Sequence, residues 1–191
     1  MGIKDKRFEK TEYLIKSTFF DMVKNNKKIT ISEIAKRANI DRKTFYLHYE
    51  SVESLYKVFM KDAESSLIEE LDRLDFFNSK DSIKTFVQAY RTIFISYKDL
   101  FYAINKNKQF IEYIEFGKTS MMPYLNKYLS RNKKQEYLER EIIYDQFFMD
   151  GLIKFQQRFI NGEFDFTLDQ YFIEIEKIAK TFAGLYSKRI K

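Results

Sequence analysis

The chain has 191 residues and a formal net charge of +6, and 45% of its residues are hydrophobic, which is enough for one or two domains with a real core and excludes a large multidomain enzyme. Only 5 Gly and 1 Pro are present, too few turn formers for the many short strands of a β-sandwich or barrel, so the composition predicts an all-α fold. The chain lacks Cys and has one His, His48, which excludes disulfides, thiolate metal sites, cysteine nucleophiles and any metal site that needs two imidazoles.

Helix signals fill the first fifty residues. Apolar side chains in residues 14–23 recur at helical spacing and predict a first helix. The segment Thr30-Ile31-Ser32-Glu33 has the form of a capping box, so a second helix is expected to begin there. Asn39 tolerates the left-handed conformation that ends a helix, and Asp41 is a suitable N-cap for a third helix. Three short helices are therefore expected here.

Longer helices are expected in the rest of the chain. Ser51 and Ser79 are candidate N-caps, Gly162 is a candidate C-terminal stop, and Thr167 to Gln170 has the form of a second capping box. The expected helices bring the total to about nine, and they cover residues 52–74, 83–97, 100–105, 110–116, 134–161 and 168–188.

The second and third short helices form a helix-turn-helix at about residues 31–49, because a turn of three or four residues joins them. In this motif the second helix lies in the DNA major groove, and residues near its N-terminus reach base edges. Arg42 suits a bidentate contact to guanine, and Thr44 suits a thymine methyl group or a phosphate. In so small a unit, Phe45, Leu47 and Tyr49 are expected in the core, and only Tyr46 is expected outside.

The positive charge is concentrated at the N-terminal end. Residues 1–50 hold 12 Lys and Arg against 7 Asp and Glu, so this quarter of the chain carries +5 of the total charge of +6. Such an excess suits a surface that binds a polyanion, although solvated lysines on an ordinary surface explain the charge equally well.

The segment from Thr30 to Tyr49 resembles the signature of TetR/AcrR-type transcriptional regulators. The Phe45-Tyr46 pair, His48 and Tyr49, and then Ser51, Glu53 and Leu55 recur at the spacing of that family, and the match extends over residues 8–68. The resemblance implies an all-helical homodimer in which a long helix joins two domains. The N-terminal domain, residues 8–68, would bind a palindromic operator. The C-terminal domain, residues 69–191, would hold a small apolar or aromatic effector and form the dimer interface.

The resemblance also implies which side chains meet DNA. Two departures from the family pattern stand out: Asn39 replaces a common Gly, and Val52 replaces a common Lys at the start of the fourth helix. The positions that match the family's contacts to bases and phosphates are Thr30, Ser32, Arg42, Lys43, Thr44, Tyr46 and His48.

The C-terminal two thirds supply candidate residues for an effector pocket and for a dimer interface. Apolar clefts with a few polar groups bind small ligands in helical domains, so aromatic and Met side chains are candidates for the pocket, although most of them belong to the core. The pocket candidates are Phe86, Tyr90, Phe94, Tyr97, Tyr113, Met121, Tyr124 and Phe148. A helix that is apolar on two sides needs two partners, which favours a dimer. The interface candidates are Phe147, Gly151, Phe155, Ile175 and Phe182.

Three functional classes compete. A DNA-binding transcriptional regulator, acting as a ligand-responsive repressor, has the most support. An adaptor that binds DNA or protein constitutively is the alternative. An enzyme is disfavoured, because paired carboxylates such as Glu112 and Glu115 lie at spacings typical of solvated helix faces and no nucleophile accompanies His48. No cofactor or metal is expected. Neither a signal peptide nor a membrane-spanning segment is recognisable, so the expected location is the cytoplasm.

Overall fold

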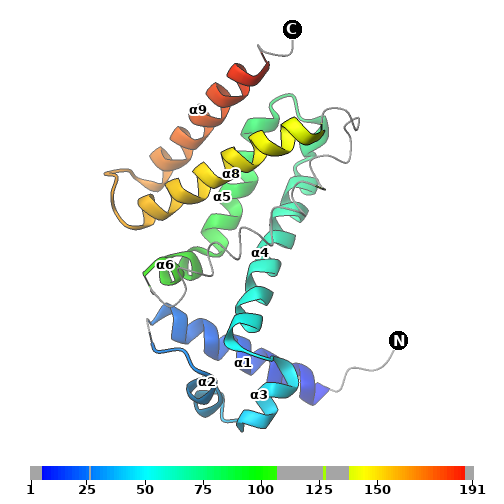
Figure 1. Ribbon diagram of the computed structural model, residues 1–191, viewed down its shortest axis with the longest axis vertical. Coiled ribbons are helices and arrows are strands. Elements are labelled where there is room, and N and C mark those ends of the chain that lie inside the picture. Colours follow the sequence, from blue (N-terminus) through cyan, green and yellow to red (C-terminus); the bar gives the residue numbers. More distant parts are fainter. Residues whose placement is uncertain (1–5, 26, 107–126, 128–137, 188–191) are drawn as a thin grey trace. The chain divides into compact units, whose positions relative to one another are not determined.

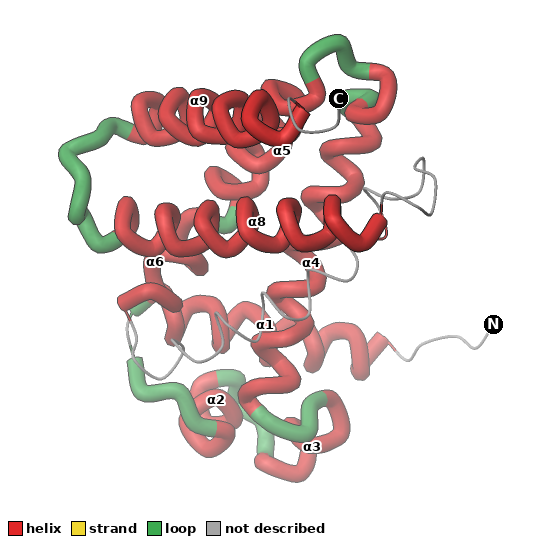
Figure 2. The backbone as a smooth tube through the Cα atoms, turned by 45° about the horizontal axis from the view of Figure 1, so that its top comes forward, coloured by secondary structure: helices red, strands yellow, loops and turns green. Residues whose placement is uncertain are grey.

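The computed structural model describes residues 6–25, 27–106, 127 and 138–187. Every regular element of these residues is a helix, as the composition predicts (Figures 1 and 2). The elements are α1 (Lys6–Lys24), α2 (Ile31–Arg37), α3 (Arg42–His48), α4 (Val52–Arg73), the 3-10 helix η1 (Phe76–Asn78), α5 (Ser82–Ser96), α6 (Lys98–Lys106), α8 (Leu138–Ile160) and α9 (Leu168–Ser187).

The chain divides into two compact units. Unit 1 comprises Met1–Asp62 and Lys98–Ile114, and unit 2 comprises Ala63–Tyr97 and Glu115–Lys191. The division falls within α4, and α6 returns to unit 1.

Unit 1 is built around the apolar side of α1. Phe19 is fully buried in this helix and stacks on Phe59 of α4, with 5.3 Å between the ring centroids. Helix α6 packs against α1 (Figure 1), buries Leu100, and adds an ion pair between Lys24 and Asp99 at 2.6 Å. This hydrogen bond to Asp99 raises the pKa of Lys24. Because α6 is distant from α1 in the sequence, no local sequence pattern predicts this contact.

Unit 2 has an aromatic core between α5 and α9. Phe94 and Tyr171 are fully buried, Phe172 is 3% exposed, and their rings lie 5.0 to 5.8 Å apart. The hydroxyl groups of Tyr90 and Tyr171 lie 3.2 Å apart, and the Tyr90 hydroxyl also donates to Oε1 of Gln156 in α8. Burial raises the pKa of Tyr90, so its hydroxyl group remains protonated and can donate within this core.

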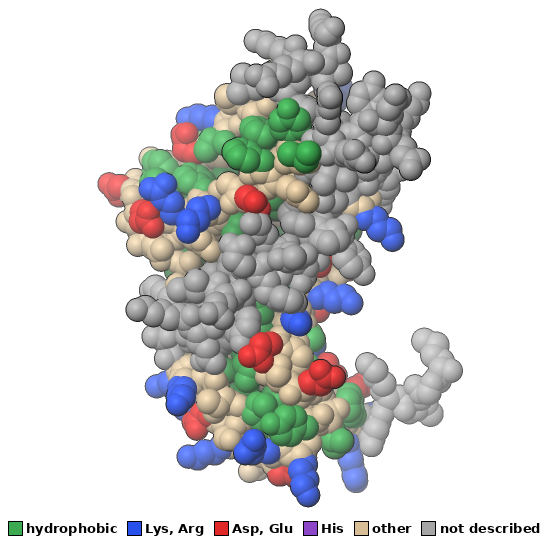
Figure 3. Space-filling view, in the orientation of Figure 1, with side chains coloured by type: hydrophobic (Ala, Val, Ile, Leu, Met, Phe, Trp, Pro, Cys, Tyr) green, Lys and Arg blue, Asp and Glu red, His purple; other side chains and the backbone are tan. Residues whose placement is uncertain are grey.

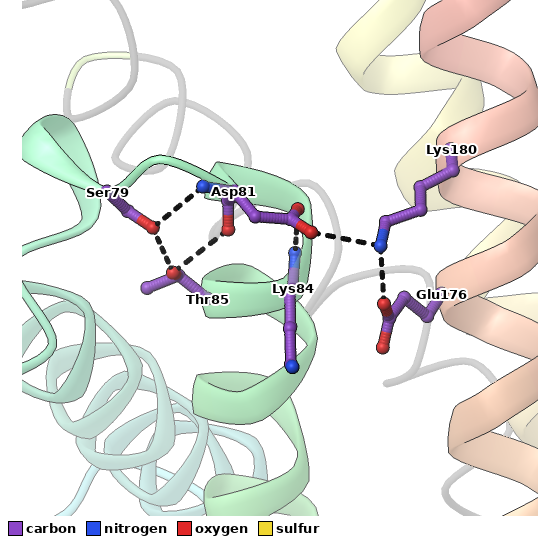
Figure 4. A network of polar contacts seen from close by, with 6 residues as sticks. All are labelled: Ser79, Asp81, Lys84, Thr85, Glu176 and Lys180. Carbon is purple, nitrogen blue, oxygen red and sulfur yellow. Dashed lines mark hydrogen bonds and ion pairs between the residues drawn. The ribbon is translucent and has the colours of Figure 1, made fainter.

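A polar network also joins α5 to α9 (Figure 4). Asp81 caps α5 by accepting a hydrogen bond of 3.0 Å from the Lys84 amide, and its other oxygen lies 2.9 Å from Nζ of Lys180. Lys180 pairs as well with Glu176 at 2.6 Å. The expectation that Ser79 caps this helix is wrong. Ser79 ends η1, and its hydroxyl group is hydrogen-bonded to the hydroxyl group of Thr85 at 2.6 Å. Asp81 is the cap because its carboxylate reaches the free amides of the first turn.

Other local signals match the structure. Asn39 has a φ of 54° and Gly162 has a φ of 73°, as expected for residues that end a helix. Thr167 and Gln170 form the reciprocal capping box, with bonds of 2.8 and 3.2 Å. The expected helix at 110–116 lies outside the described residues. No described helix combines the length and apolar character needed to span a bilayer.

Candidate nucleic-acid interface

Helices α2 and α3 form the helix-turn-helix that the sequence predicts. Thr30 caps α2, since its hydroxyl accepts a hydrogen bond of 3.2 Å from the amide of Glu33. The Glu33 carboxylate accepts from Nε of Arg37 at 2.9 Å instead of closing the capping box. The turn then passes through Asn39, and the amide of Ile40 donates to the carbonyl of Ala35 at 3.0 Å. These bonds fix the direction in which the chain enters α3.

Asp41 starts α3. Its carboxylate accepts a hydrogen bond of 2.7 Å from the Thr44 amide, and this bond holds the pKa of Asp41 below its usual value. An ionised carboxylate at this position also favours the positive end of the helix dipole. At neutral pH the N-terminal turn of α3 is therefore held by a charged cap, and the nearby charge of Lys43 also lowers the pKa of Asp41.

One side of α3 is buried and the other is open. Phe45 is fully buried and Tyr49, just after the helix, is 7% exposed, as expected for core residues. Arg42, Lys43 and Tyr46 are exposed, and Thr44 is half-buried. Lys and Arg side chains surround the end of unit 1 that carries α2 and α3 (Figure 3). This side of α3 therefore combines basic groups with hydrogen-bonding side chains.

The expectation that Leu47 belongs to the core is wrong, because this side chain is 74% exposed. Phe45 and Tyr49 already occupy the buried side of α3, and a residue two positions after Phe45 points to nearly the opposite side of a helix. Leu47 was expected in the core because of its residue type. The helical phase set by Phe45 predicts instead that its side chain is exposed to solvent.

His48 is held by α1. Its ring stacks on Phe8 with 3.9 Å between the centroids, and its Nδ1 is buried without a hydrogen-bond partner among the described residues. Burial lowers the pKa of His48, so the imidazole is neutral at pH 7. The adjacent Tyr49 hydroxyl donates to Glu12 of α1 at 3.4 Å. Helix α1 thus anchors the C-terminal end of α3.

The remaining predicted DNA contacts lie at the starts of helices. Thr30 is half-buried and Ser32 is exposed, and both lie at the start of α2. Ser51 and Ser54 cap the start of α4 through reciprocal hydrogen bonds of 3.1 Å. Val52 is 8% exposed and packs in the core. Its side chain therefore cannot take over the surface contact of the Lys that is common at this position in the TetR/AcrR pattern.

The pocket candidates within the described residues do not gather at one place. Tyr90 and Phe94 contact each other in the buried aromatic core, with centroids 6.3 Å apart. Phe86 and Tyr97 pack instead around Leu67, Leu71, Ala89 and Ile93, where Tyr97 also bonds Ser66. Phe148 contacts Phe182. Tyr113, Met121 and Tyr124 lie outside the described residues. Gln156 and Tyr171, the polar partners of Tyr90, were not anticipated from the sequence.

The interface candidates separate into exposed and buried residues. Phe147 is 70% exposed and stacks on Phe182 at 6.0 Å. Gly151 is exposed, and a Cβ added there would meet no heavy atom of the described residues within 4 Å. Phe155 stacks on Tyr171 at 5.2 Å, and Ile175 is 2% exposed, so both belong to the core of unit 2.

We use the name α8–α9 apolar surface for Ile143, Phe147, Ile178 and Phe182, of which the first three are at least half exposed.

Comparison with known proteins supports the fold. No protein-family model matches the chain, and no curated protein matches it in sequence. Among solved structures, the fatty acid degradation regulator FadR from Bacillus halodurans is similar, with a TM-score of 0.59 and 13% sequence identity over 93% of this chain and 96% of that chain. At this identity the similarity shows a shared all-helical fold along nearly the whole length of both chains.

Proposed function

We propose that this protein is a sequence-specific DNA-binding transcriptional regulator that acts as a homodimeric, ligand-responsive repressor in the cytoplasm. The observation that carries the proposal is the open side of α3, where Arg42, Lys43 and Tyr46 project from a helix fixed by the Asp41 cap and by buried Phe45. The resemblance to TetR/AcrR-type regulators and the FadR-like fold support the same function.

In this proposal, α3 enters the major groove, and side chains around it hold phosphates. The contacts come from Thr30, Ser32, Arg42, Lys43, Thr44, Tyr46 and His48. Phosphate contacts fix the register of a protein on DNA, whereas contacts to base edges provide specificity. Arg42 is the candidate for guanine. Neutral His48 is a hydrogen-bond donor through Nε2 when its buried Nδ1 carries no proton.

A homodimer would place two copies of α3 on a palindromic operator. Half-sites one helical turn apart require the two recognition helices to lie about 34 Å apart. An effector that binds unit 2 and favours another arrangement of the units would disrupt this spacing. The aromatic residues of unit 2 suit an apolar or aromatic effector. Fatty acids are the first class to test, because FadR is a fatty acid degradation regulator.

The test is selection of bound fragments from the source genome with purified protein at two salt concentrations. Affinity for the DNA backbone falls steeply with salt, whereas a specific site remains enriched. We expect a palindrome to be enriched at both salt concentrations. Uniform binding that disappears at the higher salt concentration would contradict the proposal.

Variants of α3 then test the interface. We expect Thr44→Ala and Tyr46→Ala each to weaken operator binding by about tenfold, the order expected for a lost hydrogen bond to a charged group. Both variants should keep the oligomeric state and the unfolding midpoint of the parent protein. Tyr13→Ala is the matched control, since Tyr13 is a 70% exposed tyrosine on α1. Unchanged affinity in both α3 variants would contradict the assigned interface.

A further inference from the structure

Leu47 is the most exposed large hydrophobic side chain among the described residues, and it lies on the recognition helix. It is 74% exposed, so it adds almost nothing to the core of unit 1. A single exposed leucine on an ordinary surface needs no explanation. Leu47, however, lies on the exposed side of α3, which the proposed function assigns to DNA.

The helical phase places Leu47 at the middle of that face. Each residue of an α-helix is turned by about 100° from the one before, so Leu47 lies about 200° from Phe45, which is fully buried. Lys43 lies one turn earlier on the same side, and Tyr46 flanks Leu47. Any duplex that receives the exposed side of α3 in its major groove therefore meets Leu47 as well as Lys43.

The chemistry of base edges restricts what Leu47 can contact. A leucine side chain neither donates nor accepts hydrogen bonds, and covering a polar base edge with it removes water without replacing the lost hydrogen bonds. Among the base edges in the major groove, the C5-methyl group of thymine is the apolar one.

We propose that Leu47 is a specificity-determining residue that selects thymine in each operator half-site by packing against the C5-methyl group. The inference rests on the proposed DNA-binding function and adds an apolar element to it. Arg42 and Lys43 supply charge and hydrogen bonds, whereas Leu47 distinguishes thymine from the other bases by shape and desolvation.

The experiment removes the methyl group without changing base pairing. Each thymine of the selected operator is replaced in turn by deoxyuridine, and the affinity of each duplex is measured for the parent protein and for Leu47→Ala. At one position per half-site, we expect deoxyuridine to weaken binding by the parent protein about fourfold, the effect of one buried methyl-sized group. Leu47→Ala should bind the two duplexes equally at that position.

Two further variants separate this contact from general effects. Leu47→Met keeps an apolar side chain of similar length and should retain the preference for thymine. Lys43→Ala should weaken binding to both duplexes and preserve their affinity ratio. Because Leu47 is exposed, the unfolding midpoints of its variants should match that of the parent protein.

The outcomes are distinct. Specific operator binding without a deoxyuridine effect, or with the same effect in Leu47→Ala, would overturn this inference and leave the proposed function standing. Absence of any specific operator would overturn the proposed function and this inference with it.

Discussion

His48 shows how the surroundings of one residue restrict its chemistry. It is the only histidine of the chain, yet no nucleophile was recognised beside it in the sequence, and its ring is stacked on Phe8 with Nδ1 buried. Burial is the main cause that lowers its pKa, and the nearby charge of Glu12 opposes this effect. A neutral imidazole at the end of α3 can donate one hydrogen bond and can pack against neighbouring rings.

The lowered pKa of His48 predicts a pH dependence of stability. As the pH falls below about 6.5, the unfolded chain binds this proton before the folded one, so the free energy of unfolding decreases. His48→Gln lacks this group. We expect the parent protein to lose more stability than His48→Gln between pH 7.5 and pH 5.5, as measured by urea denaturation at both values. Equal losses in the two proteins would show that His48 does not titrate in the way its burial indicates.

At the scale of elements, the turn between α2 and α3 depends on one backbone conformation. Asn39 has a φ of 54°, in the left-handed region that Asn and Gly tolerate better than other residues. This turn determines how α3 leaves α2. Asn39, at a position where Gly is common in the TetR/AcrR pattern, therefore supplies the left-handed conformation of this turn.

Substitution at Asn39 tests this account. We expect Asn39→Ala to lower the free energy of unfolding by about 1 kcal/mol, because alanine lacks the local hydrogen bonding that lets Asn adopt this conformation despite its Cβ. Asn39→Gly is the matched control and should be at least as stable as the parent protein. Both effects are read from urea denaturation at neutral pH. An alanine variant as stable as the glycine variant would show that the turn does not need the left-handed conformation.

At the scale of the whole molecule, the α8–α9 apolar surface is where we expect a second copy to bind. Ile143 is 63% exposed, Phe147 is 70% exposed and Ile178 is 50% exposed, and these side chains come from two helices that pack against each other. Gly151 leaves open space on α8, which permits the close approach of another helix. A symmetric pairing of these helices would bury the whole surface.

A charge on this surface should prevent dimer formation. We expect Phe147→Asp to sediment as a monomer while the parent protein sediments as a dimer, because the interface would bury an unpaired carboxylate. Phe147 is largely exposed in the single chain, so the variant should still fold. Tyr13→Asp is the control, since Tyr13 is an equally exposed aromatic residue on α1. A dimeric Phe147→Asp variant, or a monomeric parent protein, would contradict the assignment.

The sequence alone determined the features that depend on hydrogen bonds within a few residues. The caps at Thr30, Asp41 and Thr167 were predicted and are confirmed, although Glu33 does not close the capping box expected with Thr30. Each of these capping bonds joins residues three positions apart. The left-handed conformation of Asn39 was also predicted and is confirmed. The helical class followed from the scarcity of turn formers and the spacing of apolar residues. The helix-turn-helix and its basic residues could therefore be predicted without knowledge of the tertiary packing.

Only the tertiary structure decided which side chains are covered. The packing of α6 against α1 joins elements distant in sequence and was not anticipated. The exposure of Leu47 and the Asp81 cap of α5 were also missed, although the helical phase relative to Phe45 and a hydrogen bond between residues three positions apart account for them locally. In unit 2, the spacing of apolar residues did not distinguish Ile175, which is buried, from Phe147, which is exposed. The physical reason is that burial depends on partners distant in sequence, and apolar residues at helical spacing look alike whether their partner is the same chain, a second copy or DNA.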